Sequence, residues 1–177
     1  SHYKAVKNHL VEGICPTTDV FLQGSFRLGT VVKPLKECKE AEYDIDIVCQ
    51  LPIAKENTTA KKLKHRVGDS LKDYTQKLDK QGRRCWTLEY AEEKNGIGFH
   101  MDILPSIPMD DIGRQVLKKR LPNANYEQHA IELTNYEKNI KVYSWVDGGS
   151  NPRGYAQWFD NIKKTRTPDY LKLSVTQ

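Results

Sequence analysis

The sequence of 177 residues has no long hydrophobic run. No stretch approaches the roughly 20 apolar residues that a membrane-spanning helix needs. The N-terminus also has no hydrophobic segment of the kind that directs secretion. Charged residues make up 29% of the chain, and the mean hydropathy is −0.69. We therefore predict a cytoplasmic protein with no membrane partner.

Cysteine is scarce and unpaired in sequence. Cys15, Cys38, Cys49 and Cys85 are widely spaced, and no C-x-x-C motif occurs. This spacing argues against a disulfide framework and against a structural zinc site. We predict four reduced thiols.

Repeats and low-complexity segments are also absent, and no strong excess of charge is present. The length suits one domain, or one and a fraction, and is sufficient to bury a core. A net charge of +5 could assist the capture of a triphosphate, but it does not by itself indicate nucleic-acid binding.

A nucleotide-binding P-loop is missing as well. Residues 24–30 read Gly-Ser-Phe-Arg-Leu-Gly-Thr, without the Gly-Lys-Ser/Thr ending of that motif. The glycine still allows backbone to approach a phosphate closely, and Ser25 would offer a hydroxyl at a helix start. An ordinary strand-to-helix turn is the alternative.

Three aspartates in apolar surroundings are the most informative residues that are present. Asp44 and Asp46 alternate in Tyr-Asp-Ile-Asp-Ile-Val, and Asp102 lies in Phe-His-Met-Asp-Ile-Leu. Side chains two apart on a strand share a face, and a neighbouring strand can bring Asp102 beside them. Carboxylates gathered in this way repel each other unless cations lie between them. Paired divalent ions suit phosphoryl chemistry.

Periodicity predicts the elements around these residues. In the first half we expect a helix over 2–12, strands over 19–23 and 43–51, and a loop or irregular hairpin over 33–42. Thr58 or Thr59 would cap a helix running to about residue 80, with an apolar stripe that ends at Leu78.

In the second half we expect strands over 84–92 and 97–104, joined by a hairpin at Asn95-Gly96. Pro105 and Pro108 would end the sheet. Residues 110–135 look irregular, a weak strand is expected over 140–146, and a short helix over 152–162.

Taken together, the Gly24-Ser25 turn, the Asp44-x-Asp46 strand and the later Asp102 resemble the polymerase-β-like nucleotidyltransferases. Residues 24–30 and 42–48, with Met101–Pro105 and the segment 151–159 (Asn-Pro-Arg-Gly-Tyr-Ala-Gln-Trp-Phe), are similar to the bacterial cGAS/DncV-like group. The resemblance covers roughly residues 20–160. Enzymes of this group make cyclic di- or trinucleotide messengers in anti-phage defence.

The resemblance implies an α+β fold of the polymerase-β-like type, with a mixed or antiparallel sheet flanked by helices. Residues 1–160 would form the catalytic lobe, and 161–177 the start of an incomplete C-terminal helical region. Asp44, Asp46 and Asp102 would be catalytic and would bind two Mg²⁺ or Mn²⁺ ions. Gly24 and Ser25 would bind the terminal phosphates of the nucleotide.

The implied substrates are NTPs (ATP, GTP or UTP), joined with release of pyrophosphate. Regulatory proteins and an effector activated by the product would be compatible partners. Two alternatives stay open: transfer to an RNA end, a small molecule or a protein hydroxyl, and an inactive nucleotide-binding module.

Other polar and aromatic residues receive structural interpretations. We expect Arg27 to form an ion pair and His100 to be a structural histidine. The basic run Lys61–Arg66 is interpreted as a solvated helix face, so nucleic-acid binding is not expected. The aromatic residues Trp145, Tyr155, Trp158 and Phe159 are expected to pack in the core or at a joint between lobes.

Overall fold

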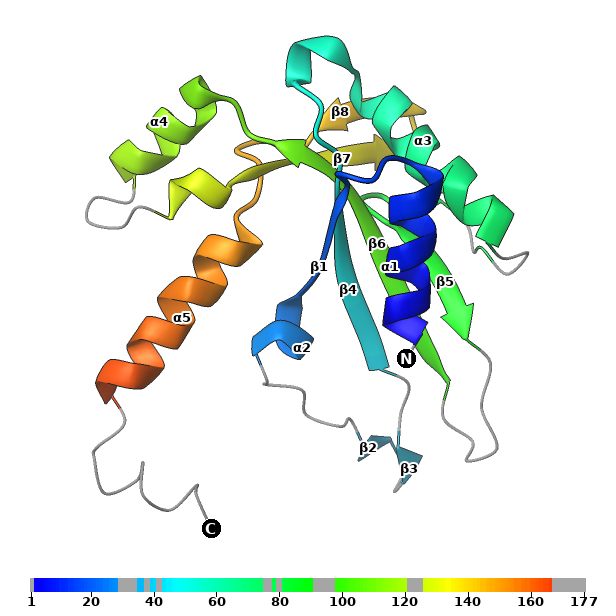
Figure 1. Cartoon of the computed structure of the whole chain (residues 1–177), viewed down its shortest axis with the longest axis horizontal. Coiled ribbons are helices and arrows are strands. Elements are labelled where there is room, and N and C mark those ends of the chain that lie inside the picture. The colour runs from blue at the N-terminus through cyan, green and yellow to red at the C-terminus, as the bar shows by residue number, and fades with distance from the viewer. Residues whose placement is uncertain are drawn as a thin grey trace.

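The computed structural model describes residues 2–28, 35–36, 39–40, 43–74, 78, 81–90, 98–120 and 126–166. Its centre is a six-stranded sheet in the order β1-β4-β6-β7-β8, with β5 pairing to β6 beside this path (Figure 1). Helices pack against the sheet, so the chain has an α+β fold.

The strands and their pairing define a mixed sheet. The bounds are β1 Asp19–Gln23, β4 Tyr43–Gln50, β5 Trp86–Tyr90, β6 Phe99–Pro108, β7 Ile131–Glu137 and β8 Val142–Trp145, with a separate pair β2 Leu35–Lys36 and β3 Lys39–Glu40. The central strands β4 and β6 are parallel. The other strand pairs are antiparallel. The predicted mixed sheet is therefore confirmed.

Two helices, α1 (His2–Gly13) and α3 (Ala60–Tyr74), lie side by side over one face of the sheet (Figure 1). Their apolar stripes are buried, as the periodicity predicted. The backbone N–H of Lys62 donates a hydrogen bond to the Thr59 hydroxyl at 3.2 Å, which is the expected cap of α3. Of the fifteen buried residues that the structure describes in the main core, these helices supply five: Val6, Leu10, Leu63, Val67 and Leu71.

Alternation along β4 separates the two faces of the sheet. Ile45, Ile47 and Cys49 are buried in the main core together with Met101 and Ile103 of β6. The residues between them, which include the aspartates, face away from α1 and α3 because successive side chains on a strand point to opposite faces. The aspartate face is thus the one that these two helices leave uncovered.

The remaining helices surround the rest of the sheet. Their bounds are α2 Gly24–Leu28, α4 Asp111–Arg120 and α5 Pro152–Arg166, with short 3₁₀ turns η1 Lys55–Asn57 and η2 Glu127–His129. The helix α2 directly continues β1 and contacts β4 and α5. It therefore lies beside the end of β4 that carries the aspartates (Figure 1).

The prediction that the sheet ends at the prolines was wrong, because β6 continues to Pro108. Along one edge of β6, pairing with β5 stops at Ile103 and pairing with β7 starts at Ser106. Pro105 falls between these registers, where a missing backbone N–H loses no ladder hydrogen bond to β5 or β7.

The prediction that residues 110–135 are irregular was also wrong, because α4 and the first part of β7 lie in this range. The Asp110 carboxylate accepts a hydrogen bond from the Gly113 N–H at 2.7 Å, so a helix-start signal was present. The predicted helix to residue 80 is too long: Leu78 instead bridges to Leu88 of β5. The predicted Asn95-Gly96 turn lies outside the described residues.

Candidate active site

The parallel pairing of β4 and β6 brings two of the aspartates together. Asp46 is the register partner of Asp102, and Asp44 is the partner of His100. All four side chains therefore occupy the face opposite α1 and α3. Asp46 and Asp102 are half-buried, whereas the side chain of Asp44 is 69% exposed. Asp44 thus marks the open rim of the site.

The electrostatics of Asp46 reflect this crowding. Burial raises the pKa of its carboxyl group, and the charges of Asp102 and Asp44 raise it further. Like charges held close together disfavour the ionised form. A cation bound between these carboxylates would relieve the repulsion.

Gly24 closes one side of the site. Its φ is +67°, a conformation that L side chains rarely adopt. A Cβ added here would come within 2.7 Å of Asp46 Oδ2. A glycine is required at this position because its backbone packs directly against the carboxylate of Asp46. Ser25 follows in α2, and its side chain lies outside the described part of the structure.

Two further contacts hold the carboxylates. His100 Nδ1 lies 3.5 Å from Asp44 Oδ1, and the structural role of this histidine stays a prediction. The hydroxyl of Thr87 donates a hydrogen bond to Asp102 Oδ1 at 2.5 Å. Sequence reasoning missed Thr87, although counting back from the predicted 84–92 and 97–104 hairpin could have placed it beside Asp102.

The donor set suits a hard divalent cation, because Mg²⁺ prefers carboxylate oxygens and keeps several waters. Among the described residues, no group of three or more His, Cys, Asp or Glu side chains is close enough to hold a metal ion. The pair Asp46 and Asp102 could share an ion that phosphate oxygens and water complete. Asp44, at the rim, could join through a change of rotamer.

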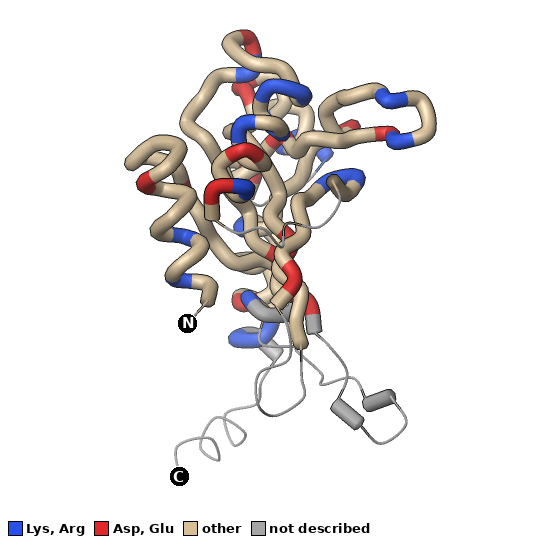
Figure 2. The backbone as a smooth tube through the Cα atoms, turned by 90° about the vertical axis from the view of Figure 1, so that its right-hand side faces the viewer, with Lys and Arg blue, Asp and Glu red and all other residues tan. Residues whose placement is uncertain are grey.

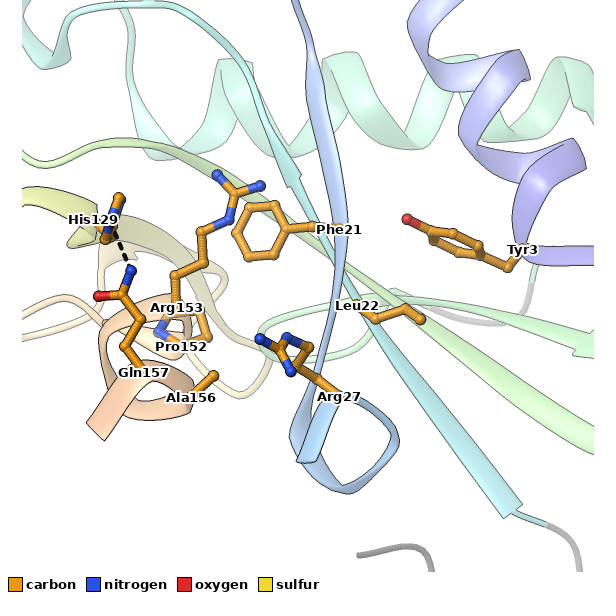
Figure 3. A pocket seen from close by; sticks show the side chains of 9 residues that line it. All are labelled: Tyr3, Phe21, Leu22, Arg27, His129, Pro152, Arg153, Ala156 and Gln157. Atoms are coloured by element: carbon orange, nitrogen blue, oxygen red, sulfur yellow. Dashed lines mark hydrogen bonds between the residues drawn. The ribbon is translucent and has the colours of Figure 1, made fainter. Parts of the chain in front are cut away.

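A cavity of about 490 Å³ lies beside this face, between the edge strand β1 and α5. Arg153 stacks on the ring of Phe21 at 3.7 Å and pairs with Asp19. Figure 3 shows Arg153 and Phe21 on the α5 side of β1, with Tyr3 and Leu22 on the other side. Arg27 pairs with Asp160 at 3.4 Å, which confirms its predicted ion pair. The two arginines join β1 and α2 to α5.

Basic and acidic residues are interspersed over the described chain (Figure 2). The expectation for Lys61–Arg66 holds in part: Lys61, Lys62 and Arg66 are exposed. Lys64 contradicts it, because its side chain is fully buried. Its ammonium donates hydrogen bonds to the carbonyls of Gly82 and Arg83 at 2.7 and 2.9 Å.

The expected packing of the aromatic residues holds only in part. Trp145 packs against the main core. Tyr155 and Trp158 are exposed, by 53% and 44%, so core burial does not hold for these two. Packing at a joint between lobes stays a prediction for them. Within the described residues, no helix is both long and apolar enough to cross a membrane.

Comparison with known proteins shows that the fold is that of a nucleotidyltransferase domain. Residues 18–105 match the family model described as cyclic GMP-AMP synthase DncV-like, nucleotidyltransferase domain. This part of the chain is a DncV-like nucleotidyltransferase domain. No curated protein matches the chain in sequence.

Solved structures share the fold. The CD-NTase CdnG of Bradyrhizobium diazoefficiens, solved with GTP, has a TM-score of 0.61 at 21% identity, covering 89% of this chain and 39% of its own. CdnE of Elizabethkingia meningoseptica, solved with GTP and Apcpp, has a TM-score of 0.56 at 17% sequence identity. The match covers 96% of this chain and 53% of CdnE.

The cyclic AMP-GMP synthase DncV of Vibrio cholerae, with a linear intermediate, gives a TM-score of 0.55 at 22% identity, covering 82% of this chain and 36% of its own. The present chain therefore spans between about a third and a half of the length of the structures it resembles. The shared part is the lobe that carries the aspartates.

Proposed function

We propose that this chain is the catalytic lobe of a metal-dependent nucleotidyltransferase that makes cyclic di- or trinucleotides from NTPs. A ribose hydroxyl oxygen of one nucleotide forms a bond to the α-phosphorus of another. The bond from that phosphorus to the bridging oxygen of the β-phosphate breaks, pyrophosphate leaves, and the hydroxyl proton passes to solvent. Repeating the step extends the linear product, and a last such step within that product closes the ring.

The observation that carries this proposal is the position of Asp46 opposite Asp102 on parallel strands, with the Gly24 backbone packed against Asp46. This arrangement places carboxylates beside a turn that backbone can use to approach phosphate. The raised pKa of Asp46 supports a site that accepts positive charge.

In this proposal Asp44 and Asp46 would bind the cations and, through them, the incoming triphosphate. Asp102 would share one cation with Asp46. Two Mg²⁺ or Mn²⁺ ions, when bound, would neutralise charge that develops on the attacking and leaving oxygens. Gly24 and Ser25 would bind the terminal phosphates. The protein's own contribution is positioning and electrostatic stabilisation.

The finer parts of the proposal rest on the family. Residues 1–160 would be the catalytic lobe, and 161–177 the beginning of a helical region. ATP, GTP or UTP would be substrates, in anti-phage defence in the bacterial cytoplasm, with a downstream effector that the product activates. The solved relatives CdnG and CdnE were crystallised with GTP, which supports nucleotide binding.

The test uses the full-length protein with four labelled NTPs and Mg²⁺ or Mn²⁺, followed by phosphatase treatment and identification of resistant products. We expect a phosphatase-resistant cyclic product that is lost in Asp46→Asn. A matched control is Asp69→Asn, which makes the same chemical change at an exposed aspartate paired with Lys72 and should leave the yield unchanged.

Other outcomes would contradict the proposal in different ways. Labelled RNA, small molecules or protein without a cyclic product would show transfer to a different acceptor. Nucleotide binding without release of pyrophosphate would show an inactive binding module.

A further inference from the structure

The carboxylate of Asp102 is held by a side chain from the neighbouring strand. Thr87 on β5 is the register partner of Asp102 on β6, and its hydroxyl donates to Asp102 Oδ1 at 2.5 Å. Both residues are half-buried. A short hydrogen bond from a hydroxyl to a carboxylate is of the stronger, charge-assisted kind.

The strand that presents Thr87 is itself anchored to α3. Trp86, the residue before Thr87, donates a hydrogen bond from its indole Nε1 to the Lys64 carbonyl at 2.9 Å. A Cβ added to Gly68 of α3 would come within 2.3 Å of the Trp86 ring. The indole therefore lies directly on the helix backbone, and only a glycine at position 68 leaves room for it.

The segment that leads into β5 is fixed by the same helix. The buried ammonium of Lys64 binds the carbonyls of Gly82 and Arg83. The Tyr136 N–H donates to the Arg83 carbonyl at 2.8 Å, which adds an anchor from β7. The path into β5 is thus held from two sides before it reaches the active-site face.

We propose that Thr87 is a positioning residue for the cation site, an inference that rests on the proposed function. Its hydroxyl fixes the orientation of the Asp102 carboxylate, which would bind a divalent cation shared with Asp46. The rigid support from α3 gives this hydrogen bond a defined geometry. Partners of this kind orient metal ligands and are worth about 10–100-fold in metal affinity.

The proposal is tested by titrating the full-length protein with Mn²⁺ in the absence of nucleotide. Thr87→Val removes the hydroxyl and keeps the shape, and we expect Mn²⁺ affinity to fall about 10–100-fold. Thr87→Ser keeps a hydroxyl and should restore most of the affinity. Thr87→Ala is a second variant without the hydroxyl, in case the valine perturbs folding.

Thr134→Val is the matched control. Thr134 on β7 is fully buried, and within the described structure its hydroxyl has no hydrogen-bond partner. This change alters a buried threonine in the same way, away from the cation site, and should leave Mn²⁺ affinity unchanged. A merely structural role for Thr87 would instead lower the melting temperature and leave the affinity of the folded protein intact.

The outcomes separate this inference from the proposed function. If the wild type binds Mn²⁺ and Thr87→Val binds it equally well, the positioning role is overturned while the proposed function stands. If the wild type itself binds no Mn²⁺ and makes no product, the proposed function fails, and this inference fails with it. In turnover, we expect Thr87→Val to raise the Mn²⁺ concentration needed for half-maximal rate more than it lowers the rate at saturation.

Discussion

The two faces of the central sheet differ in what covers them. On one face Ile47, Met101 and Ile103 have no exposed surface and pack beneath α1 and α3. On the other, Asp46 and Asp102 stand at adjacent positions of the same strands but remain half-exposed. The buried core and the half-exposed aspartates are therefore separated by a single residue step along β4 and β6.

Burial also varies along the aspartate face itself. Val48 and Leu104, on the aspartate face, are buried in a second cluster with Ile131 and Leu133 of β7. The uncovered part of that face is limited to the end where β1 runs into α2. The fold thus leaves open the end at which the aspartates, the Gly24 turn and Thr87 meet.

The largest expected effect is on the uncovered face. Asp46→Asn should lower turnover at least about a hundredfold, because it removes a shared ligand charge worth several kcal/mol in the transition state. The metal-free fold should be retained and even gain stability at neutral pH. The raised pKa of Asp46 means that its ionised form destabilises the folded state, a cost that disappears in acid.

Turnover at neutral pH, and thermal unfolding followed from neutral pH down to below the ordinary aspartate pKa of about 3.9, measure both effects for Asp46→Asn. Retention of more than about a tenth of the turnover, a loss of under 1.4 kcal/mol, would reject the role of Asp46.

The next effect belongs to the covered face. Ile103→Ala, one residue from Asp102, should lower the free energy of unfolding by about 2–5 kcal/mol, because it opens a cavity in the core. At temperatures where the variant is folded, Mn²⁺ affinity should change little. Denaturant unfolding and Mn²⁺ titration together check this. A stable Ile103→Ala variant with lost metal binding would show that the two faces are not separate.

On the covered side of the sheet, the buried Lys64 of α3 should make the free energy of unfolding depend on pH. Burial lowers the pKa of Lys64 to about 8 from its usual 10.5. Between these values the unfolded chain keeps the proton that the folded chain has lost, so stability should rise with pH in this window. Lys64→Met should remove that rise and also leave two carbonyls without a donor, at a cost of about 1–3 kcal/mol.

Unfolding free energies of wild type and Lys64→Met from pH 7 to 10.5 test the linkage. The difference between the two proteins should grow in favour of the wild type above pH 8. A difference that is flat with pH would mean that Lys64 titrates as an exposed lysine does.

Gly24→Ala should have a smaller effect on stability, with a specific consequence for the site. A residue with a Cβ at φ +67° costs about 1–2 kcal/mol, and the new methyl would displace the Asp46 carboxylate. We expect Gly24→Ala to lose more Mn²⁺ affinity than Gly148→Ala does. Gly148 has φ +70° but open space around its Cβ position, so it controls for backbone strain alone.

The smallest effect is expected on the exposed basic residues. Charge reversal of Lys61 and Lys62, both exposed on α3, should leave product yield unchanged with or without added duplex. A lone basic helix face binds duplex weakly at physiological salt. Stimulation of the wild type by duplex, lost in the reversed variant, would show a nucleic-acid sensor instead.

Much of the central sheet could be predicted because local signals and tertiary packing agree there. Alternation in Asp44–Val48 marked both the strand and its two faces, and a second apolar strand was enough to place Asp102 beside it. The pairing of Asp46 with Asp102 in register required the parallel β4–β6 pair, which sequence alone did not fix.

The misses came from residues whose surroundings override their usual preference. Pro105 is tolerated in β6 because it falls between two strand pairings. Lys64 is buried, although a lysine in a basic run usually faces solvent, because the carbonyls of residues 82 and 83 accept hydrogen bonds from its ammonium group. The strand β7 was not predicted because the polar residues Glu132 and Asn135 interrupt its apolar pattern, although five successive residues of β7 are buried.

We propose that the uncovered end of the sheet binds divalent cations between Asp46 and Asp102. Anomalous diffraction from crystals of the full-length protein with Mn²⁺ and a non-hydrolysable NTP would locate these ions. We expect an anomalous peak within about 2.0–2.3 Å of oxygens from both carboxylates, with the triphosphate next to Gly24, and no such peak in Asp46→Asn. Nucleotide and Mn²⁺ bound elsewhere in the wild type, with this face empty, would contradict it.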